Sequence, residues 1–275
     1  MYLCELTGLM SGNFRIGLMQ LAVTESKRDN LERVLSAIER SETSDLLIFP
    51  EYCMGYPEHG LSRQYLKDLA EPLNGEFVSK VAELSGKKQV EIVLPIFQRS
   101  GGDIFNTAAI IDQGKIKGGY RKIHLFDAFG YRESDLFRAG SDPVLFKLRD
   151  LTIGVVICYD IRFPELVKEE VMSGARVVIV PSAWFRGPLK EEQWQTLLIA
   201  RAHENTSYMI GVGNAHEAFV GRSIVVDPQG VKVMDLEAGD RVGFCQIDDA
   251  RVTEAREKLP VLQQSKAPSL HCQIL

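Results

Sequence analysis

Residues 151–174 read LTIGVVICYDIRFPELVKEEVMSG, and this stretch decides the fold. Positions 151–157 are apolar at nearly every residue, which predicts a strand that is buried on both faces. Pro164 suits the first turn of a helix, and Gly174 suits the position just after its last turn. A second apolar run follows at 175–181, so the order strand, helix, strand predicts an α/β fold.

The same pattern recurs on both sides of this stretch. Helices are predicted around 31–38 and 77–84, where apolar residues repeat every three or four positions, and at 190–205. We expect one domain over residues 1–275, because neither an internal repeat nor a linker rich in Gly, Ser or Pro divides the chain. Residues 1–13 are expected to form a short N-terminal extension, and about 253–275 an extended C-terminal tail. Apolar runs between turn residues predict further strands at 14–22, 45–50, 90–97, 106–111, 207–213 and 222–226.

Composition and charge exclude several classes of protein. The formal net charge is −5 with both signs interspersed, which argues against a nucleic-acid partner. We expect no membrane span, because no apolar run approaches the roughly 20 residues that cross a bilayer. Residues 1–13 do not read as a signal peptide, so a cytoplasmic location is expected. The five cysteines and five histidines are scattered without metal-ligand spacing, so we expect reduced thiols, no metal and no cofactor.

Three chemically useful side chains stand at or near the ends of strand-like runs. Cys158 follows the run 151–157, Glu51 follows the run that ends at Pro50, and Lys122 follows a shorter one. Catalytic groups are often presented on such loops. Taken singly, each has an ordinary interpretation: an inert packed thiol, a solvated acid and a basic surface turn. Only their combination points to a site.

The segments around these residues resemble, in the same order, the three signature segments of the nitrilase (carbon-nitrogen hydrolase) superfamily. They are FPE at 49–51, YRK at 120–122 and VICYD at 156–160. Further segments look like family landmarks, so the resemblance covers about 14–262. It implies a four-layer αββα sandwich and association into a homodimer or higher homo-oligomer. These landmarks are FNTA at 105–108, GYRES at 130–134, PSAW at 181–184, RAHEN at 201–205 and VDPQG at 226–230.

Carried over residue by residue, the resemblance implies a catalytic set without a metal. Cys158 is the nucleophile, Glu51 the general base and acid, and Lys122 stabilises the oxyanion, with the backbone N–H of Tyr159 as second donor. These roles suit amide hydrolysis, because an amide carbonyl is a poor electrophile and its nitrogen needs a proton to leave. Glu133 matches a second family glutamate that would hold Lys122, although a surface acid in a turn is the alternative.

The residues after Cys158 read YDIRFPEL and resemble the ω-amidase and deaminated glutathione amidase branch. A small amide, in particular an ω-amide of a dicarboxylic acid, is therefore the expected substrate. Arg162 is the candidate for binding the remote carboxylate; the alternative is that it pairs with Asp160 or Glu165. Tyr56 and Trp184 are candidates for pocket walls, or they pack in the core. The segments 53–60 and 127–131 differ from the ω-amidase pattern.

Two other functions stay open. A nitrilase or an N-carbamoyl amidase would use the same three residues and differ only in its pocket contacts. A catalytically silent binding protein of the same fold is a further alternative, since a fold does not guarantee activity. The presence of Glu51, Lys122 and Cys158 together argues against this last one.

Overall fold

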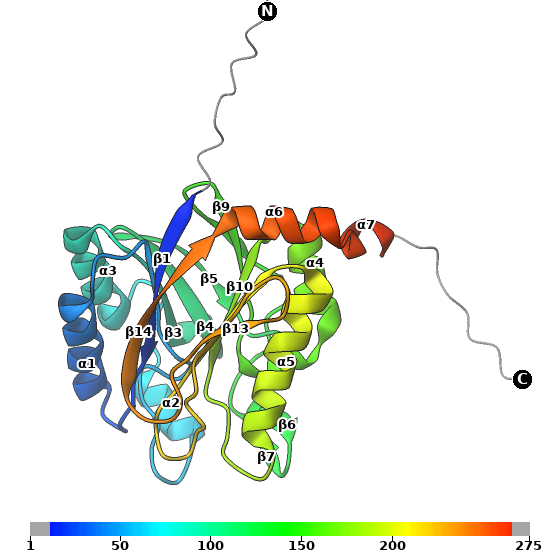
Figure 1. The fold of residues 1–275 in the computed structure, drawn as a ribbon. Coiled ribbons are helices and arrows are strands. Elements are labelled where there is room, and N and C mark those ends of the chain that lie inside the picture. The colour runs from blue at the N-terminus through cyan, green and yellow to red at the C-terminus, as the bar shows by residue number, and fades with distance from the viewer. Residues whose placement is uncertain (1–11, 266–275) are drawn as a thin grey trace, which may run out of the picture.

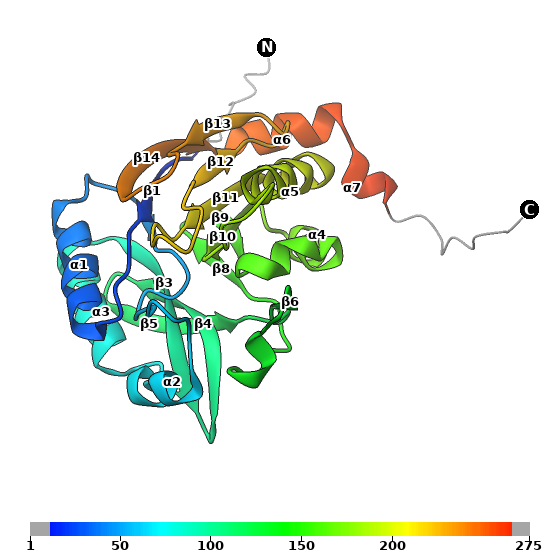
Figure 2. The ribbon, with the colours of Figure 1, turned by 90° about the horizontal axis from the view of Figure 1, so that it is seen from below.

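The computed structural model describes residues 12–265, which build two six-stranded sheets. The sheets pack face to face, as Figures 1 and 2 show from two directions. The first sheet has the order β14-β1-β2-β3-β4-β5, formed by Arg241–Asp248, Asn13–Gln20, Leu46–Ile48, Glu91–Ser100, Asp103–Asp112 and Lys115–Arg121. The second has the order β13-β12-β11-β10-β9-β8, formed by Lys232–Asp235, Ile224–Val226, Tyr208–Gly213, Val177–Ser182, Leu151–Val155 and Leu145–Leu148.

Helices cover the outer face of each sheet. The helices α1 (Lys27–Arg40) and α3 (Glu76–Lys88) pack on the first sheet, and α4 (Pro164–Met172) and α5 (Lys190–Asn205) pack on the second (Figure 2). The predicted four-layer αββα sandwich is therefore confirmed. The shorter α2 spans Arg63–Leu69. None of the helices within residues 12–265 combines the length and apolar character needed to cross a bilayer.

The pleat of β2 explains why the strands are apolar at consecutive positions. Leu46 and Ile48 pack into the core between the two sheets, whereas Leu47 packs under the helices on the outer face. Successive side chains of a strand point to opposite faces, and here both faces are covered. Burial on both sides thus produces the continuous apolar runs of the central strands.

The direction of the strands brings several chain segments to one end of the sandwich. β2 is parallel to β1 and β3, and β9, β10 and β11 are parallel to one another. β5 runs in the direction of β3, because two antiparallel pairings separate them. The chain leaves β2, β5, β9 and β10 just before Glu51, Lys122, Cys158 and Ala183. Ligand sites of α/β proteins form at such carboxyl ends.

The expectation of an extended C-terminal tail is wrong for its first part. Residues 253–258 belong to helix α6 (Asp249–Lys258), and α7 follows at Val261–Gln264. Asp248 caps α6 by accepting a hydrogen bond from the Ala250 N–H, and Val252 is buried on the second sheet's core. The sequence pattern was weak because this helix buries only two residues. The rest of the predicted tail, 266–275, and residues 1–11 lie outside the described residues, while Asn13 already belongs to β1.

The sequence also missed strands at the edges of the sheets. β13 and β14 have mostly exposed or half-buried residues. Edge strands need only one covered face and often carry charge. They therefore lack the continuous apolar runs that revealed the central strands.

Candidate active site

The structure brings Glu51, Lys122 and Cys158 together in one pocket at the carboxyl ends of the strands. Its empty space is about 360 Å³, part of it open to solvent. Cys158 comes from the loop after β9, Glu51 from the loop after β2 and Lys122 from the end of β5. The pocket walls also include Tyr52, Phe126, Tyr159, Arg162, Ala183, Trp184, Phe185 and Lys190.

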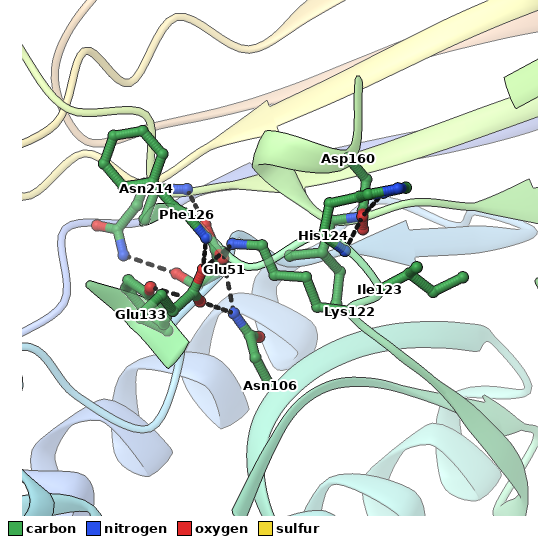
Figure 3. A network of polar contacts seen from close by, with 12 residues as sticks. Glu51, Asn106, Lys122, Ile123, His124, Phe126, Glu133, Asp160 and Asn214 are labelled. Atoms are coloured by element: carbon green, nitrogen blue, oxygen red, sulfur yellow. Dashed lines mark hydrogen bonds and ion pairs between the residues drawn. The ribbon is translucent and has the colours of Figure 1, made fainter. Parts of the chain in front are cut away.

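Lys122 lies between two carboxylates. Its Nζ is 2.9 Å from Oε1 of Glu51 and 2.8 Å from Oε2 of Glu133, as Figure 3 shows. All three side chains are at most 1% exposed. Buried charges are stable only when they are paired and hydrogen-bonded. The alternative of Glu133 as a surface acid is therefore excluded, because its side chain is fully buried against Lys122.

The Glu51 carboxylate is held on both oxygens. Asn106 donates from Nδ2 to Oε1 of Glu51 over 2.7 Å and to Oε1 of Glu133 over 3.1 Å, so it bridges the two acids. The backbone N–H of Ala183 donates to Oε2 of Glu51 over 2.7 Å. Asn214 donates to the backbone carbonyl of Glu51 over 2.9 Å (Figure 3). These contacts leave Glu51 little freedom to rotate away from the pocket.

Glu133 is fixed in the same way. Its Oε2 accepts a hydrogen bond from the Phe126 N–H over 2.7 Å, and its Oε1 accepts one from the Tyr52 hydroxyl over 3.2 Å. Phe126 stands just before the β6–β7 hairpin, formed by Asp127–Ala128 and Tyr131–Arg132. Glu133 thus connects the Lys122 ammonium to the loop that forms one wall of the pocket.

Burial and neighbouring charges shift the pKa values of Glu51 and Lys122. Burial raises the pKa of Glu51 above its ordinary value, Lys122 opposes this, and the negative charge of Glu133 adds to it. Burial on its own disfavours a charged Lys122, but Glu133 and Glu51 raise the Lys122 pKa well above the ordinary value. Lys122 therefore stays protonated, and Glu51 is a carboxylate that accepts a proton readily.

The Cys158 thiol has a raised pKa, although the Lys122 ammonium lies nearby. Burial raises the pKa of the Cys158 thiol, and the negative charge of Glu51 raises it further. Lys122 and the Ser182 hydroxyl lower it by less. The free protein thus holds a neutral thiol close enough to the Glu51 carboxylate for a hydrogen bond.

Asp160 fixes the turn that presents Cys158. Cys158 has a φ of +49°, in the left-handed region that non-glycine residues rarely adopt, and starts a 3-10 helix at Cys158–Arg162. Oδ2 of the buried Asp160 accepts hydrogen bonds from the Ile157 N–H over 3.0 Å and the Tyr120 hydroxyl over 2.8 Å. Its Oδ1 accepts one from the His124 N–H over 2.8 Å (Figure 3). Asp160 therefore joins the Cys158 turn to the segment that carries Lys122.

The three substrate-binding candidates are placed differently. Arg162 lines the pocket, where its Nη2 donates to Oε1 of Gln193 over 2.9 Å and its guanidinium lies 4.8 Å from the ring centroid of Trp184. It forms no ion pair with Asp160 or Glu165, so that alternative is wrong. Trp184 also lines the pocket. Tyr56 is not among the lining residues; it packs in the core beside Phe219, with ring centroids 4.6 Å apart.

Several residues of the site were not singled out from the sequence. Asn106 and Asp160 stand within segments recognised as family landmarks, but one sequence does not tell where their side chains point. Asn214 follows β11 and Lys190 begins α5. An asparagine or a lysine at such a position does not by itself indicate a functional role. Among residues 12–265, no group of three His, Cys, Asp or Glu side chains is placed to hold a metal ion.

Known proteins resemble this chain over nearly its whole length. The carbon-nitrogen hydrolase family model matches residues 15–257. The deaminated glutathione amidase of Escherichia coli O157:H7 is 32% identical, over 90% of this chain and 95% of its own. The omega-amidase NIT2 of Mus musculus is 29% identical, over 92% and 95%. The crystal structure of Saccharomyces cerevisiae Nit3, a member of the nitrilase superfamily, superposes with a TM-score of 0.81 at 27% identity, over 93% of this chain and 97% of Nit3.

Proposed function

This chain belongs to the carbon-nitrogen hydrolase family, and from that premise we propose that it hydrolyses the C–N bond of a small amide through Cys158. The observation that carries the proposal is the pocket in which the Cys158 thiol faces the Glu51 carboxylate and the Lys122 ammonium. Relatives named as amidases match nine-tenths of the chain, which supports amide bonds as the target.

In the first half of the proposed reaction, Glu51 accepts the thiol proton while the sulfur of Cys158 bonds to the amide carbonyl carbon. The carbonyl oxygen becomes an anion beside Lys122 and the backbone N–H of Tyr159. The C–N bond then breaks, and Glu51 returns the proton to the leaving nitrogen, so a primary amide releases ammonia. The acyl group stays on Cys158 as a thioester.

In the second half, water replaces ammonia. Glu51 takes a proton from the water as its oxygen bonds to the thioester carbon, and Lys122 again faces the oxyanion. The C–S bond breaks, the proton passes to the sulfur, and the carboxylic acid leaves. Glu133 positions Lys122 throughout, because it holds the side of the ammonium that Glu51 does not. The raised pKa of Glu51 suits a group that must take a proton in one step and give it back in the next.

We infer that the amide is an ω-amide of a short dicarboxylic acid. Arg162 lines the pocket together with Cys158, and a guanidinium binds a carboxylate through two parallel hydrogen bonds. The relatives named deaminated glutathione amidase and omega-amidase support an amide with a second acidic group.

The thioester provides the direct test. The purified protein is mixed with glutaramate, quenched in acid and weighed by intact mass spectrometry; an added acyl group is expected on the wild type and not on Cys158→Ala. A panel of glutaramate, a nitrile and a ureido acid identifies the reaction. Turnover of the nitrile or the ureido acid without turnover of any amide would replace the proposal by a nitrilase or an N-carbamoyl amidase. Binding without any adduct or product would indicate a silent protein.

We also propose a cytoplasmic homodimer or higher homo-oligomer. The described cysteines Cys53, Cys158 and Cys245 are free thiols, which suits a reducing compartment. The assembly follows from the family resemblance alone. Fractionation of the source cells and light scattering on the purified protein test the two statements separately.

A further inference from the structure

A second cation besides Arg162 lines the pocket. Lys190 is the first residue of α5, and it lines the same pocket as Cys158 and Arg162. Nε1 of Trp184 donates a hydrogen bond to the Lys190 backbone carbonyl over 3.0 Å, while the Trp184 ring lies under the Arg162 guanidinium. One tryptophan therefore positions both cations at the same side of the pocket.

No carboxylate in the described part of the chain neutralises either cation. Within residues 12–265, neither Arg162 nor Lys190 has a carboxylate oxygen within 4.0 Å. The Arg162 Nε is buried and has no acceptor there. Burial, and then the positive charge of Arg162, lower the pKa of Lys190 below the ordinary lysine value. The two groups thus repel each other in a partly desolvated place, which is unfavourable unless an anion joins them.

The charges of the pocket point to the same conclusion. Lys122 faces the two carboxylates of Glu51 and Glu133, so the catalytic end carries one net negative charge. Arg162 and Lys190 add two positive charges farther along the pocket wall. A substrate with one carboxylate would therefore make the whole set neutral.

The present partner of Lys190 leaves its hydrogen-bond donors available. The Lys190 ammonium lies 3.9 Å from the ring centroid of Phe129, at the tip of the β6–β7 hairpin. The Phe129 side chain is 79% exposed, so this contact is at the pocket mouth. A cation–π contact at an exposed site is weak. It keeps the ammonium in place without supplying a carboxylate or carbonyl acceptor for its three N–H groups.

We propose that Lys190 is a specificity-determining residue that binds the remote carboxylate of the substrate together with Arg162. This inference rests on the proposed function for the position of the scissile amide, next to Cys158. Arg162 offers the planar, bidentate contact and Lys190 offers a point charge that closes over the same carboxylate. The site therefore selects monoamides of short dicarboxylic acids over neutral amides of equal length.

Binding of glutarate tests the inference without requiring catalysis. Isothermal titration calorimetry compares the wild type with Lys190→Gln, Lys190→Arg and the control Lys168→Gln, which removes a half-buried lysine on α4. Because a hydrogen bond to a charged group is lost, Lys190→Gln is expected to weaken glutarate binding about tenfold. Lys190→Arg should recover most of that loss, and Lys168→Gln should bind like the wild type. Equal glutarate affinity of Lys190→Gln and the wild type, or no binding to the wild type, would overturn the inference.

Kinetics then separate this inference from the proposed function. The ratio of kcat/KM for glutaramate to that for pentanamide is measured in the wild type and in Lys190→Gln. We expect this ratio to fall about tenfold, mainly through KM for glutaramate, because the lost contact is a binding contact. An unchanged ratio would overturn the role of Lys190 while leaving amide hydrolysis intact. A wild type that hydrolyses no amide would refute the proposed function, and the glutarate titration would still decide the role of Lys190.

Discussion

The variant Glu133→Gln tests how the paired carboxylates tune the site. Glu133 accepts hydrogen bonds from four groups: the Lys122 ammonium, the Asn106 amide, the Tyr52 hydroxyl and the Phe126 N–H. Glutamine keeps the shape but replaces one acceptor oxygen by a donor, so at least one of these donors loses its acceptor. Leaving a buried group unsatisfied costs about 1–3 kcal/mol, and we expect a loss of unfolding free energy of this size.

The effect on activity has a second component. Lys122 loses one of its two charge-assisted hydrogen bonds, each worth about 1.5–3 kcal/mol, so kcat/KM should fall roughly 10- to 150-fold if Lys122 moves. Removing the Glu133 charge also lowers the pKa of Glu51, because that charge helps to raise it. Activity requires ionised Glu51, so the acid limb of the kcat/KM profile should move to lower pH.

The assay is a set of pH profiles for glutaramate hydrolysis, with thermal unfolding of the same samples. Glu165→Gln is the matched control, because it makes the same chemical change at an exposed position on α4. It should leave both the acid limb and the midpoint of unfolding unchanged. An acid limb of Glu133→Gln that stays in place or moves to higher pH would refute the reasoning about Glu133 and Glu51.

Three further variants probe other parts of the site and core. Glu51→Gln is expected to stay folded and lose nearly all turnover in the glutaramate assay, because Glu51 is the carboxylate that forms a hydrogen bond with the Cys158 thiol; near wild-type kcat would contradict its role. Asp160→Asn should lower the unfolding free energy by about 1–3 kcal/mol and also reduce kcat, measured by denaturant titration and kinetics, because the Cys158 turn loses an acceptor. Burial raises the pKa of Glu170 to about 8, so wild-type stability should fall as pH rises between the unfolded value near 4.5 and 8, by up to about 1.4 kcal/mol per pH unit. Glu170→Gln should make that fall smaller, because Glu91 and Glu51, whose pKa values are also raised, still contribute. Identical pH profiles of the two proteins in denaturant titration would contradict the role of Glu170.

The sequence predicted the central elements of the fold because buried strands require apolar residues, and these are visible in the sequence. The runs at 45–50, 151–157 and 175–181 are apolar on consecutive residues, since both faces of β2, β9 and β10 are covered. The edge strands and α6 were missed or misassigned for the converse reason. α6 is held by polar contacts such as the hydrogen bond from Arg176 to Thr253, over 2.6 Å, which leave no periodic apolar signal.

The residues of the candidate site also fall into those that the sequence indicated and those that only the structure revealed. Residue type and position at the end of a strand made Glu51, Lys122 and Cys158 candidates only. The resemblance of the segments around them to the family signatures selected them as a set. Asn106 contacts Glu51 and Glu133, which lie 55 and 27 residues away in the sequence. Asp160 joins the second sheet to Tyr120 and His124, which lie 40 and 36 residues away. Arg162 illustrates the remaining gap: its partner Gln193 lies 31 residues away, whereas the sequence suggested neighbours within three. The pKa of Cys158 was also beyond the sequence, since its sign depends on burial and on the distance to Glu51.

The raised pKa of Cys158 is compatible with its proposed role because the reaction conserves charge inside the buried site. When Glu51 accepts the thiol proton, one negative charge moves from the carboxylate to the sulfur, and the total around Lys122 is unchanged. Attack moves that charge on to the carbonyl oxygen, which again faces Lys122. A low-dielectric site penalises the creation of a net charge far more than its transfer between neighbours. The negative charge is thus located first on Glu51, then on Cys158 and then on the substrate oxygen. Lys122, held by Glu133, is the counter-ion at each stage.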